Sequence, residues 1–210
     1  MIKWNKSGPK EWDKMKSEQP YRSTIKSRPY FYIETKKLSG LIRQGYKEPQ
    51  LKEQVMNNNI FQVKTESRKR EIASVILSRL EVLDDYLIKQ ISEADVDSSK
   101  IIVLYAIMKT DRLFYEFMNE VFSEKIVYQD LSLTDPDFNI FFEGKRQQSD
   151  RIASWRDYTF YKLQQVYMRI LSEAGLLKKR KILIPIINPD VLEHIRNSDG
   201  PRFIDVLVGG

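Results

Sequence analysis

Residues 99–126, SKIIVLYAIMKTDRLFYEFMNEVFSEKI, form the stretch of sequence that decides the fold. Apolar side chains recur in it at helical spacing and cover much of the helix circumference: Leu104, Ile107, Met108, Leu113, Phe114, Phe117, Met118 and Phe122. A helix with so little polar surface has to be covered by other elements. We therefore predict a buried, central helical segment here, divided into two helices near Thr110 and Asp111.

Amphipathic helices are predicted on the N-terminal side of this segment. Residues 29–45 have Pro29 as a first-turn residue and Gly45 as a stop, with inward side chains at Tyr30, Ile33, Leu38, Leu41 and Ile42. A short helix over 48–56 follows and ends at three asparagines. Residues 66–83 form the clearest helix of this half, with Thr65 as its N-cap and Ile72, Val75, Ile76, Leu80 and Leu83 on one face. Residues 84–94 add a further helix, and the Asp and Ser residues of 95–99 suit an N-cap.

The C-terminal half begins with a linker that leads into two more helices. Thr134 or Asp135 followed by Pro136 is a helix start signal. The last long helix runs from near Asp157 to a stop at Gly175, with Tyr158, Tyr161, Leu163, Val166, Ile170 and Leu171 inward. The β-branched stretches KILIPIINP (181–189) and RFIDVLVGG (202–210) bracket a short helix and predict two short strands or extended edges.

The predicted fold class is mainly α: two small helical bundles with helix-turn-helix-like elements and a minor β element near the C-terminus. We expect a basic N-terminal arm over 1–28, an N-terminal helical domain over 29–95, and a C-terminal helical domain over 96–210. The chain of 210 residues, with 41% hydrophobic residues, is long enough to fill such cores.

Composition restricts the classes of function. The sequence has no cysteine, which excludes disulfides, thiolate nucleophiles and cysteine metal sites and favours a cytoplasmic location. The longest apolar runs are far below the length of a membrane span, so we expect no membrane partner. The net charge of +6 is uneven, because residues 1–47 hold 12 Lys and Arg against 4 Asp and Glu. A positive field concentrated in one segment favours a polyanionic partner, nucleic acid first.

The residues that carry catalysis in other proteins have structural explanations here. His194 is the single histidine, so it has no partner for a metal site or a nucleophile, and we read it as a partly exposed helix residue. The carboxylate pairs stand at helix starts, where they cap helices and complement the dipole: Asp84 with Asp85, Asp95 with Asp97, and Asp135 with Asp137. No phosphate-loop, dinucleotide or zinc-protease motif is present. We therefore predict a protein that is not an enzyme and takes no cofactor.

Cations at helix starts are more informative. Arg68, Lys69 and Arg70 open a helix that follows a short helix and a turn, which is the layout of a helix-turn-helix. Cations in a first turn oppose the helix dipole, and contact with phosphate would explain them. The alternative is that they are solvated or paired with Glu66 and Glu71.

Two further basic groups are candidates for phosphate contact. The N-terminal arm contributes Arg22, Lys26 and Arg28. A second helix, turn and helix layout mixes Trp155, Tyr158 and Tyr161 with five cations: Lys145, Arg146, Arg151, Arg156 and Lys162. Such a set can donate to phosphate and lie against sugars and bases. The alternative is a surface of arginines extending over a tyrosine-rich core.

The order of several segments resembles the BrxA family of bacterial BREX phage-exclusion systems. The resemblance covers about residues 28–205 and is carried by RLEVL (79–83), LYAIMKTDRLFYEFMNEV (104–121), and Trp155, Thr159, Gln165 and EAGLL (173–177). It implies an all-helical protein of two bundles, similar in part to the NusB antitermination fold, that binds nucleic acid through basic helix-turn-helix-like surfaces in phage defence. This family has no defined base-contacting motif.

These observations lead to one favoured hypothesis and two alternatives. We expect a non-enzymatic accessory protein of a BREX system that binds double-stranded DNA, mainly through phosphates. The first alternative is a scaffold that docks onto other BREX proteins and uses its basic face for acidic protein surfaces. The second is RNA binding of the NusB kind.

Overall fold

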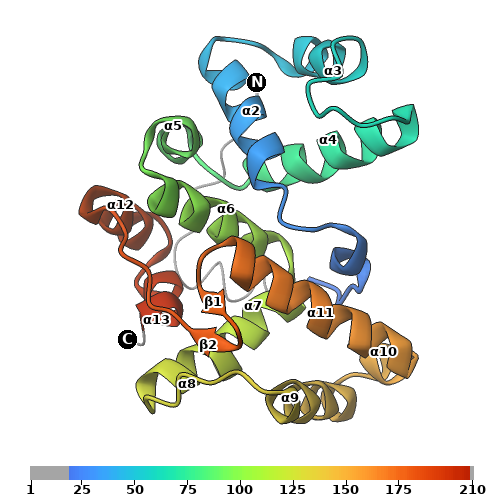
Figure 1. Ribbon diagram of the computed structural model, residues 1–210, viewed down its shortest axis with the longest axis vertical. Helices are drawn as coiled ribbons and strands as arrows, with labels where there is room; N and C mark the ends of the chain where they lie inside the picture. Colours follow the sequence, from blue (N-terminus) through green and yellow to red (C-terminus); the bar gives the residue numbers. More distant parts are fainter. Residues whose placement is uncertain (1–18, 209–210) are drawn as a thin grey trace.

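The computed structural model describes residues 19–208, and helices joined by short loops make up nearly all of it (Figure 1). Its one sheet among these residues is a two-stranded hairpin. The predicted mainly α fold with a small β element near the C-terminus is confirmed. In chain order the elements are the 3-10 helix η1 (Thr24–Ser27), α2 (Tyr32–Arg43), α3 (Glu48–Met56), α4 (Glu66–Leu80), α5 (Asp85–Glu93), α6 (Val96–Thr110), α7 (Arg112–Phe117), the π-helical turn η2 (Met118–Phe122), α8 (Ser123–Val127), α9 (Asp135–Gln148), α10 (Asp150–Ala153), α11 (Asp157–Glu173), β1 (Leu177–Lys178), β2 (Lys181–Ile182), α12 (Pro189–Asp199) and α13 (Arg202–Val208).

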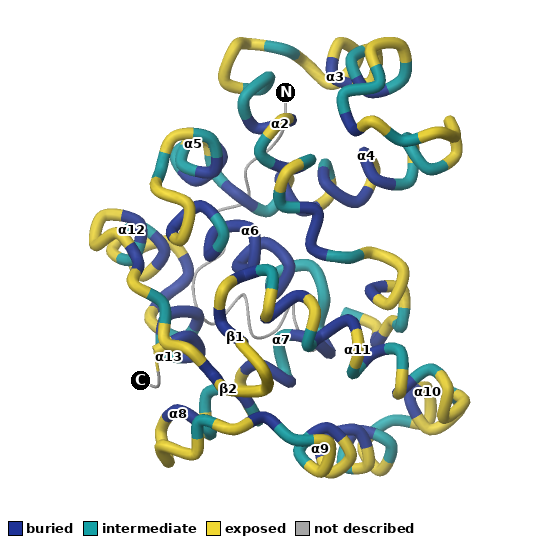
Figure 2. Tube along the Cα trace, viewed as in Figure 1, coloured by how far each residue is buried: buried dark blue, intermediate teal, exposed yellow. Residues whose placement is uncertain are grey.

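Helix α6 lies at the centre of the core, as its sequence predicts. Every residue from Ile101 to Met108 is buried. Helices α4, α5 and α7 pack against it, and Figure 2 shows it as a dark-blue segment enclosed by the rest of the chain. Burial on all sides removes the whole apolar circumference of this helix from water, which is the main favourable term in folding.

The predicted division of the central segment at Asp111 is confirmed. The Asp111 backbone is extended, and its N–H donates to the Ile107 carbonyl at the end of α6. Its side chain accepts a hydrogen bond of 2.9 Å from the Phe114 N–H and so caps α7. One residue therefore ends one helix and begins the next.

Helix α2 begins at Tyr32, three residues later than the sequence predicts. Phe31 adopts the left-handed conformation, with φ of 55°, which breaks the helix before that point. The predicted inward face is also wrong at one position, because Ile33 is 58% exposed. Tyr30 and Leu38 are fully buried as expected, and Gly45 ends the helix with a φ of 92°.

Caps fix the other N-terminal helices where the sequence places them. The Thr65 side chain accepts from the Arg68 N–H at the start of α4. Asp84 accepts from the Leu87 N–H at α5, and Asp95 accepts from the Ser98 N–H at α6. The predicted apolar face of α4, from Ile72 to Leu80, is buried.

Helix α11 starts at Asp157 and ends before Gly175, as predicted, but two of its tyrosines face outward. Tyr158 is 67% and Tyr161 54% exposed, which contradicts their predicted inward positions. The buried stripe passes through Phe160, Leu163, Val166, Tyr167, Ile170 and Leu171. This stripe has helical spacing and leaves both tyrosines on the opposite face.

The C-terminal β element is smaller than predicted, because residues 202–208 form helix α13 instead of a strand. Phe203 and Val206 pack inward at helical spacing, and the Phe203 ring meets the Tyr105 ring edge-on at 4.9 Å. This contact with the central helix outweighs the β preference of the segment. The remaining hairpin joins β1 to β2 through Lys179 and Arg180, both with positive φ, as a two-residue turn of this twist requires.

The first eighteen residues of the expected N-terminal arm lie outside the described residues, and its last ten lie inside. The expected domain boundary at 95/96 stays a prediction. No helix between residues 19 and 208 is long and apolar enough to cross a membrane.

Candidate nucleic-acid interface

The basic N-terminal segment is fixed to the core by two buried side chains. Ile25 is 3% exposed, and the Tyr21 hydroxyl donates to the Glu116 carboxylate at 3.0 Å. Burial, together with the charge of Glu116, raises the pKa of Tyr21 to about 12, so this donor stays protonated. These anchors hold the segment between them in one place on the protein surface.

The three cations of this segment lie at the protein surface. Arg22, Lys26 and Arg28 are exposed, and within residues 19–208 none of them forms an ion pair. A cation without an acidic partner keeps its full charge for a ligand. All three sequence-predicted arm residues therefore remain available for phosphate contact.

Arg79 of α4 holds the end of the same segment. Its guanidinium donates to the carbonyls of Arg28, Pro29 and Tyr30 at 2.9 to 3.0 Å. The side chain is buried, and burial lowers the pKa of Arg79 to about 10. Sequence reasoning missed this residue. The sequence does indicate it, because Arg79 lies at helical spacing from Ile72 and Val75 and therefore on the apolar face of the helix.

At the start of α4 the structure shows the alternative that the sequence left open. Arg68 pairs with Glu71 at 2.6 Å, and Arg70 pairs with Glu66 at 3.0 Å. Both ion pairs are partly or largely exposed, so each is worth little and a phosphate could compete for the cation.

Lys69 has a structural role in the same turn. Its ammonium donates to the Met56 carbonyl at 2.9 Å and so caps the C-terminal end of α3. This bond fixes the angle between α3 and α4, the two helices of the first helix-turn-helix-like layout.

Phe31 connects the N-terminal segment to the start of α4. The guanidinium of Arg68 lies 5.4 Å from the centre of its ring, and that of Arg79 lies 5.9 Å from it. Because Phe31 follows the segment that carries Arg28, this shared ring places the arm and the first turn of α4 next to each other. The two predicted basic groups are thus neighbours in space.

The third basic group, between α9 and α11, is divided by the structure. Lys145 is 4% exposed and binds the carboxylates of Glu116 and Glu120 at 2.9 and 2.5 Å. These two carboxylates neutralise the charge of Lys145 within the protein, so it is not available to a ligand. Arg146 pairs with Asp157 and lies over the Phe160 ring at 4.2 Å.

The remaining cations of this group lie at the surface. Arg151 and Arg156 are exposed and form no ion pair in the described part of the chain. Lys162 lies 5.3 Å above the Tyr158 ring and 5.8 Å from the Tyr161 ring. The cation thus lies over two neighbouring exposed aromatic rings, a combination of groups that can contact phosphates, sugars or bases.

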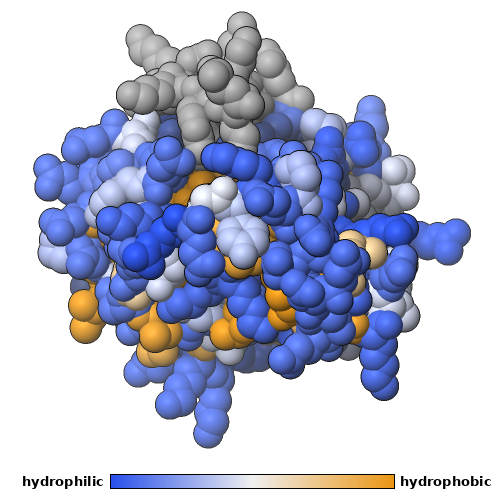
Figure 3. All heavy atoms as spheres, turned by 90° about the horizontal axis from the view of Figure 1, so that it is seen from above, coloured by the Kyte–Doolittle hydropathy of each residue, from blue (hydrophilic) through white to orange (hydrophobic). Residues whose placement is uncertain are grey.

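The three basic groups succeed one another along one side of the molecule. In Figure 1 the turquoise N-terminal end of α4, the blue segment η1 and helix α10 follow one another down the right-hand side. Helix α11 packs against η1, so the N-terminal segment lies beside a helix of the basic group between α9 and α11. Figure 3 looks onto the end that carries α2, α3 and α4, where hydrophilic side chains dominate and apolar ones form small separate spots.

Residues that could hold a metal do not gather in the described chain. Between residues 19 and 208 no group of three or more His, Asp and Glu side chains is placed to bind an ion. His194 is partly exposed, as predicted, and its Nε2 lies 2.6 Å from the Asp84 carboxylate. Its ring also packs against Tyr86 at 4.2 Å, which accounts for its position.

Fold and surface together define a small, mainly helical protein with a row of cations along one side. The model of the BrxA family matches residues 19–199. The BREX protein BrxA of Bacillus cereus (strain H3081.97) is 60% identical over 199 residues, which cover 93% of this chain and all of that protein. The chain therefore belongs to the BrxA family, as its sequence segments predict.

More distant relatives agree with this assignment. The BREX protein BrxA of Paramagnetospirillum magneticum (strain ATCC 700264 / AMB-1) is 21% identical over 87% of this chain and 94% of its own length. The crystal structure of an uncharacterized protein from Magnetospirillum magneticum superimposes with a TM-score of 0.76 at 20% identity, covering 90% of this chain and all of that one. The second comparison supports the fold.

Proposed function

We propose that this protein binds double-stranded DNA through its phosphates, as a non-enzymatic accessory component of a BREX phage-defence system. The contacts come from Arg22, Lys26 and Arg28 of the N-terminal segment and from Arg151 and Arg156 near the start of α11. Arg68, Arg70, Arg146 and Lys162 flank this row. Lys69 and Lys145 take no part, since their ammonium groups bind the protein itself.

One observation carries the proposal. Five exposed cations without acidic partners in the described chain lie on segments that follow one another along a single side of the molecule. Leaving like charges close together costs free energy unless a polyanion neutralises them. The regular charge spacing of a duplex meets this need without any base contact. We accordingly expect little sequence preference.

The salt dependence of binding tests the proposal. With about five phosphate contacts, affinity for a duplex should fall roughly 10²- to 10³-fold between 50 and 200 mM salt, because each contact releases condensed counterions. Fluorescence anisotropy with a labelled duplex measures this. Absence of binding at 50 mM salt, or an affinity that hardly changes over this range, would overturn the proposal.

A matched pair of variants locates the surface. The substitutions Arg151→Gln and Arg156→Gln together should weaken duplex binding and lower its salt dependence. The control combines Lys178→Gln with Lys179→Gln, which removes the same charge from exposed residues around the hairpin turn. Equal losses in the two variants would mean that net charge, not this surface, governs binding.

A second function, docking onto another protein of the BREX assembly, is favoured by the segment after β2. Leu183, Ile184 and Ile186 are 38%, 52% and 88% exposed, which leaves apolar side chains of one short run in water. Ile184→Ser with Ile186→Ser should reduce binding of a partner protein and leave duplex affinity unchanged. An effect on duplex affinity alone would count against this second function.

RNA binding is separated from DNA binding by competition. A labelled duplex is challenged with unlabelled duplex DNA and with single-stranded RNA at equal nucleotide concentration. Our proposal expects the duplex to compete better, because the proposed contacts are mainly ion pairs with the regularly spaced phosphates of a double helix. Better competition by RNA would favour the NusB-like alternative.

A further inference from the structure

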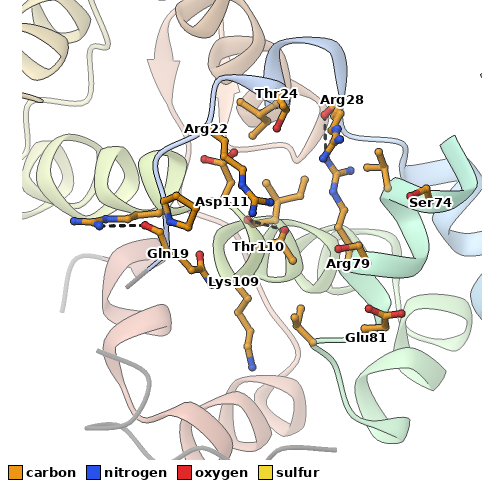
Figure 4. A pocket seen from close by; sticks show the side chains of 17 residues that line it. Gln19, Arg22, Thr24, Arg28, Ser74, Arg79, Glu81, Lys109, Thr110 and Asp111 are labelled. Carbon is orange, nitrogen blue, oxygen red and sulfur yellow. Dashed lines mark hydrogen bonds between the residues drawn. The ribbon is translucent and has the colours of Figure 1, made fainter. Parts of the chain in front are cut away.

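A cavity of about 370 Å³ lies between the N-terminal segment, helix α4 and the junction of α6 with α7. Figure 4 shows Arg22 and Arg79 reaching toward the same space from different elements, whereas Lys109 points away from it. Its volume falls in the range of pockets that hold small organic ligands. The cavity is therefore large enough for a nucleotide.

Arg79 in the wall of this cavity forms no direct ion pair with a described residue, and the nearby charge of Asp111 compensates its burial only in part. Three of its five N–H groups donate to main-chain carbonyls, and the described chain supplies no acceptor for the other two. A buried guanidinium is costly unless its charge and its N–H groups are satisfied, and an anion in the cavity would add to what the three carbonyls and Asp111 supply. The depressed pKa of Arg79 has the same origin, since burial disfavours its charge.

The rest of the lining is suited to an anion. Arg22 and Arg28 at the rim carry charges without acidic partners in the described chain. The hydroxyls of Thr24, Ser74 and Ser78 line the same space and make no hydrogen bond with other described residues. Cations together with small hydroxyl donors are the groups that bind phosphoryl oxygens in proteins.

Two acids belong to the lining and offset part of this charge. Asp111 is committed to the N-cap of α7, where its carboxylate accepts from the Phe114 N–H. Glu81 stands at the opposite end of the lining, after the last turn of α4, as the close-up shows. Three arginines therefore face the cavity against two carboxylates, which leaves the lining with an excess of positive charge.

The sequence segments that carry the family resemblance meet at this cavity. RLEVL (79–83) supplies Arg79, and the segment 104–121 supplies Thr110 and Asp111. The proposed duplex surface uses neither segment, so its function does not account for their composition. The tertiary structure brings them together around one recess.

We propose that this cavity binds a phosphoryl group carried by a nucleotide-sized ligand, with Arg22, Arg28 and Arg79 as its cationic wall. The inference goes beyond duplex binding, because a recess of this volume admits one nucleotide and not a continuous double-helical backbone. A free nucleotide and the 5′-phosphorylated end of a strand share the chemistry that the wall recognises.

Isothermal titration calorimetry with defined probes tests the site and separates the two sources. The probes are AMP, adenosine, and one short single strand with either a 5′-phosphate or a 5′-hydroxyl, all at 50 mM salt. Binding of AMP but not of adenosine assigns a free nucleotide. Tighter binding of the 5′-phosphorylated strand without AMP binding assigns a strand end. If no phosphate-bearing probe binds better than its phosphate-free counterpart, the proposal is overturned.

A matched pair of substitutions places the binding in this cavity. Ser78 is exposed on α4, so both Ser78→Asp and Ser78→Asn should fold. A carboxylate added to the wall should weaken the phosphate-bearing probe about tenfold or more, because it repels the anion at short range. The amide of similar size should change affinity little. Equal effects of the two substitutions would place the ligand elsewhere and refute the assignment.

Arg22 and Arg28 belong to both proposals, so the test has to distinguish cavity binding from duplex binding. Binding of a 5′-hydroxyl duplex is measured in parallel on the same Ser78 variants. Loss of probe binding in Ser78→Asp with duplex affinity kept supports the cavity as a separate site. A protein that binds AMP but no duplex would sustain this inference while the proposed function fails.

Discussion

Arg79 holds three consecutive main-chain carbonyls on the basic side of the molecule. The carbonyls of residues 28–30 accept hydrogen bonds from its guanidinium instead of from backbone N–H groups of a longer α2. This explains why the helix predicted from Pro29 begins only at Tyr32. A cation in the middle of an apolar helix face is thus a sign of a main-chain binding partner.

Replacing Arg79 by Met should destabilise the protein by about 2–4 kcal/mol, because three carbonyls lose their donors in a buried place. Urea denaturation measures the change in the free energy of unfolding. Arg28→Gln, at an exposed position of the same segment, is the control and should cost about 0.5 kcal/mol or less. Similar losses in the two variants would remove the structural role that we assign to Arg79.

Glu116 joins Tyr21, Arg112 and Lys145 into a network under the N-terminal segment. Its carboxylate binds Arg112 at 2.7 Å and Lys145 at 2.9 Å. Burial alone would raise the pKa of Glu116, but the hydrogen bonds from Arg112 and Lys145 outweigh it and hold the pKa below its ordinary 4.5. The same carboxylate also neutralises the charge of Lys145.

A carboxyl group whose pKa is lower in the folded state than in the unfolded state stabilises the fold at pH values above its unfolded-state pKa. This contribution is lost as the pH falls through the folded-state pKa. Glu116→Gln should therefore be less stable than the parent protein at pH 7, and the difference should shrink below about pH 4.5. Thermal unfolding between pH 7 and pH 3 measures the difference. Glu53→Gln, on the exposed side of α3, serves as control and should show no such convergence. A pH-independent difference for Glu116→Gln would contradict the network.

At the scale of elements, helix caps determine where most helices begin. Asp95, Asp84 and Asp111 each accept a main-chain hydrogen bond at a helix start, with lengths of 2.8 to 2.9 Å. These interactions link residues three apart in the chain. The caps therefore depend on the local sequence and can be predicted without knowledge of the tertiary structure.

Asp95→Ala should destabilise the protein by about 1 kcal/mol, because the first turn of α6 loses its side-chain acceptor. Asp97 lies exposed in the same turn, where its charge complements the helix dipole, so Asp97→Ala should cost a few tenths of a kcal/mol. Thermal unfolding at neutral pH compares the two variants. Equal shifts would indicate that charge near the helix end, not the cap, is responsible.

The β1–β2 turn offers a test in the stabilising direction. Lys179 has a φ of 48°, a conformation that costs a residue such as lysine more than asparagine or glycine. Lys179→Asn should raise stability by a few tenths of a kcal/mol to about 1 kcal/mol. The same substitution at Lys178, which is in a strand, is the control and should not stabilise. A gain at both positions would point to charge reduction instead of turn geometry.

At the scale of the whole molecule, the basic side combines groups from distant parts of the chain. The N-terminal segment and α11 are more than a hundred residues apart, and the packing of η1 on α11 places the segment beside this helix. A single duplex that follows this side would contact both groups at once.

Simultaneous contact predicts additive salt effects. Neutralising Arg22, Lys26 and Arg28 should lower the slope of log affinity against log salt by about 0.9 for each lost phosphate contact, and neutralising Arg151 and Arg156 should do likewise. The combined variant should lose the sum of both changes. A combined loss no larger than that of one group would show that the two groups bind different duplexes.

Much of the fold was predictable from local pattern. The central helix follows from the apolar run 101–108, the division at Asp111 follows from a capping residue, and the start of α9 follows from Thr134 and Pro136. The sequence predicted that the candidate site is basic, but it did not predict which of the cations are free to bind a ligand. Charge at helix starts identified the basic groups, whereas the burial of Lys145 and the commitment of Lys69 to Met56 depend on partners elsewhere in the chain.

By itself, the sequence determined the helices, their caps and an excess of positive charge near the N-terminus, because periodicity and capping act between residues three or four apart. The tertiary structure alone decided that residues 202–208 are helical, since Phe203 packs against Tyr105 nearly a hundred residues away. It also decided which cations reach solvent and where Arg79 faces a cavity. Such choices depend on contacts between distant residues, and only the folded chain brings those residues together.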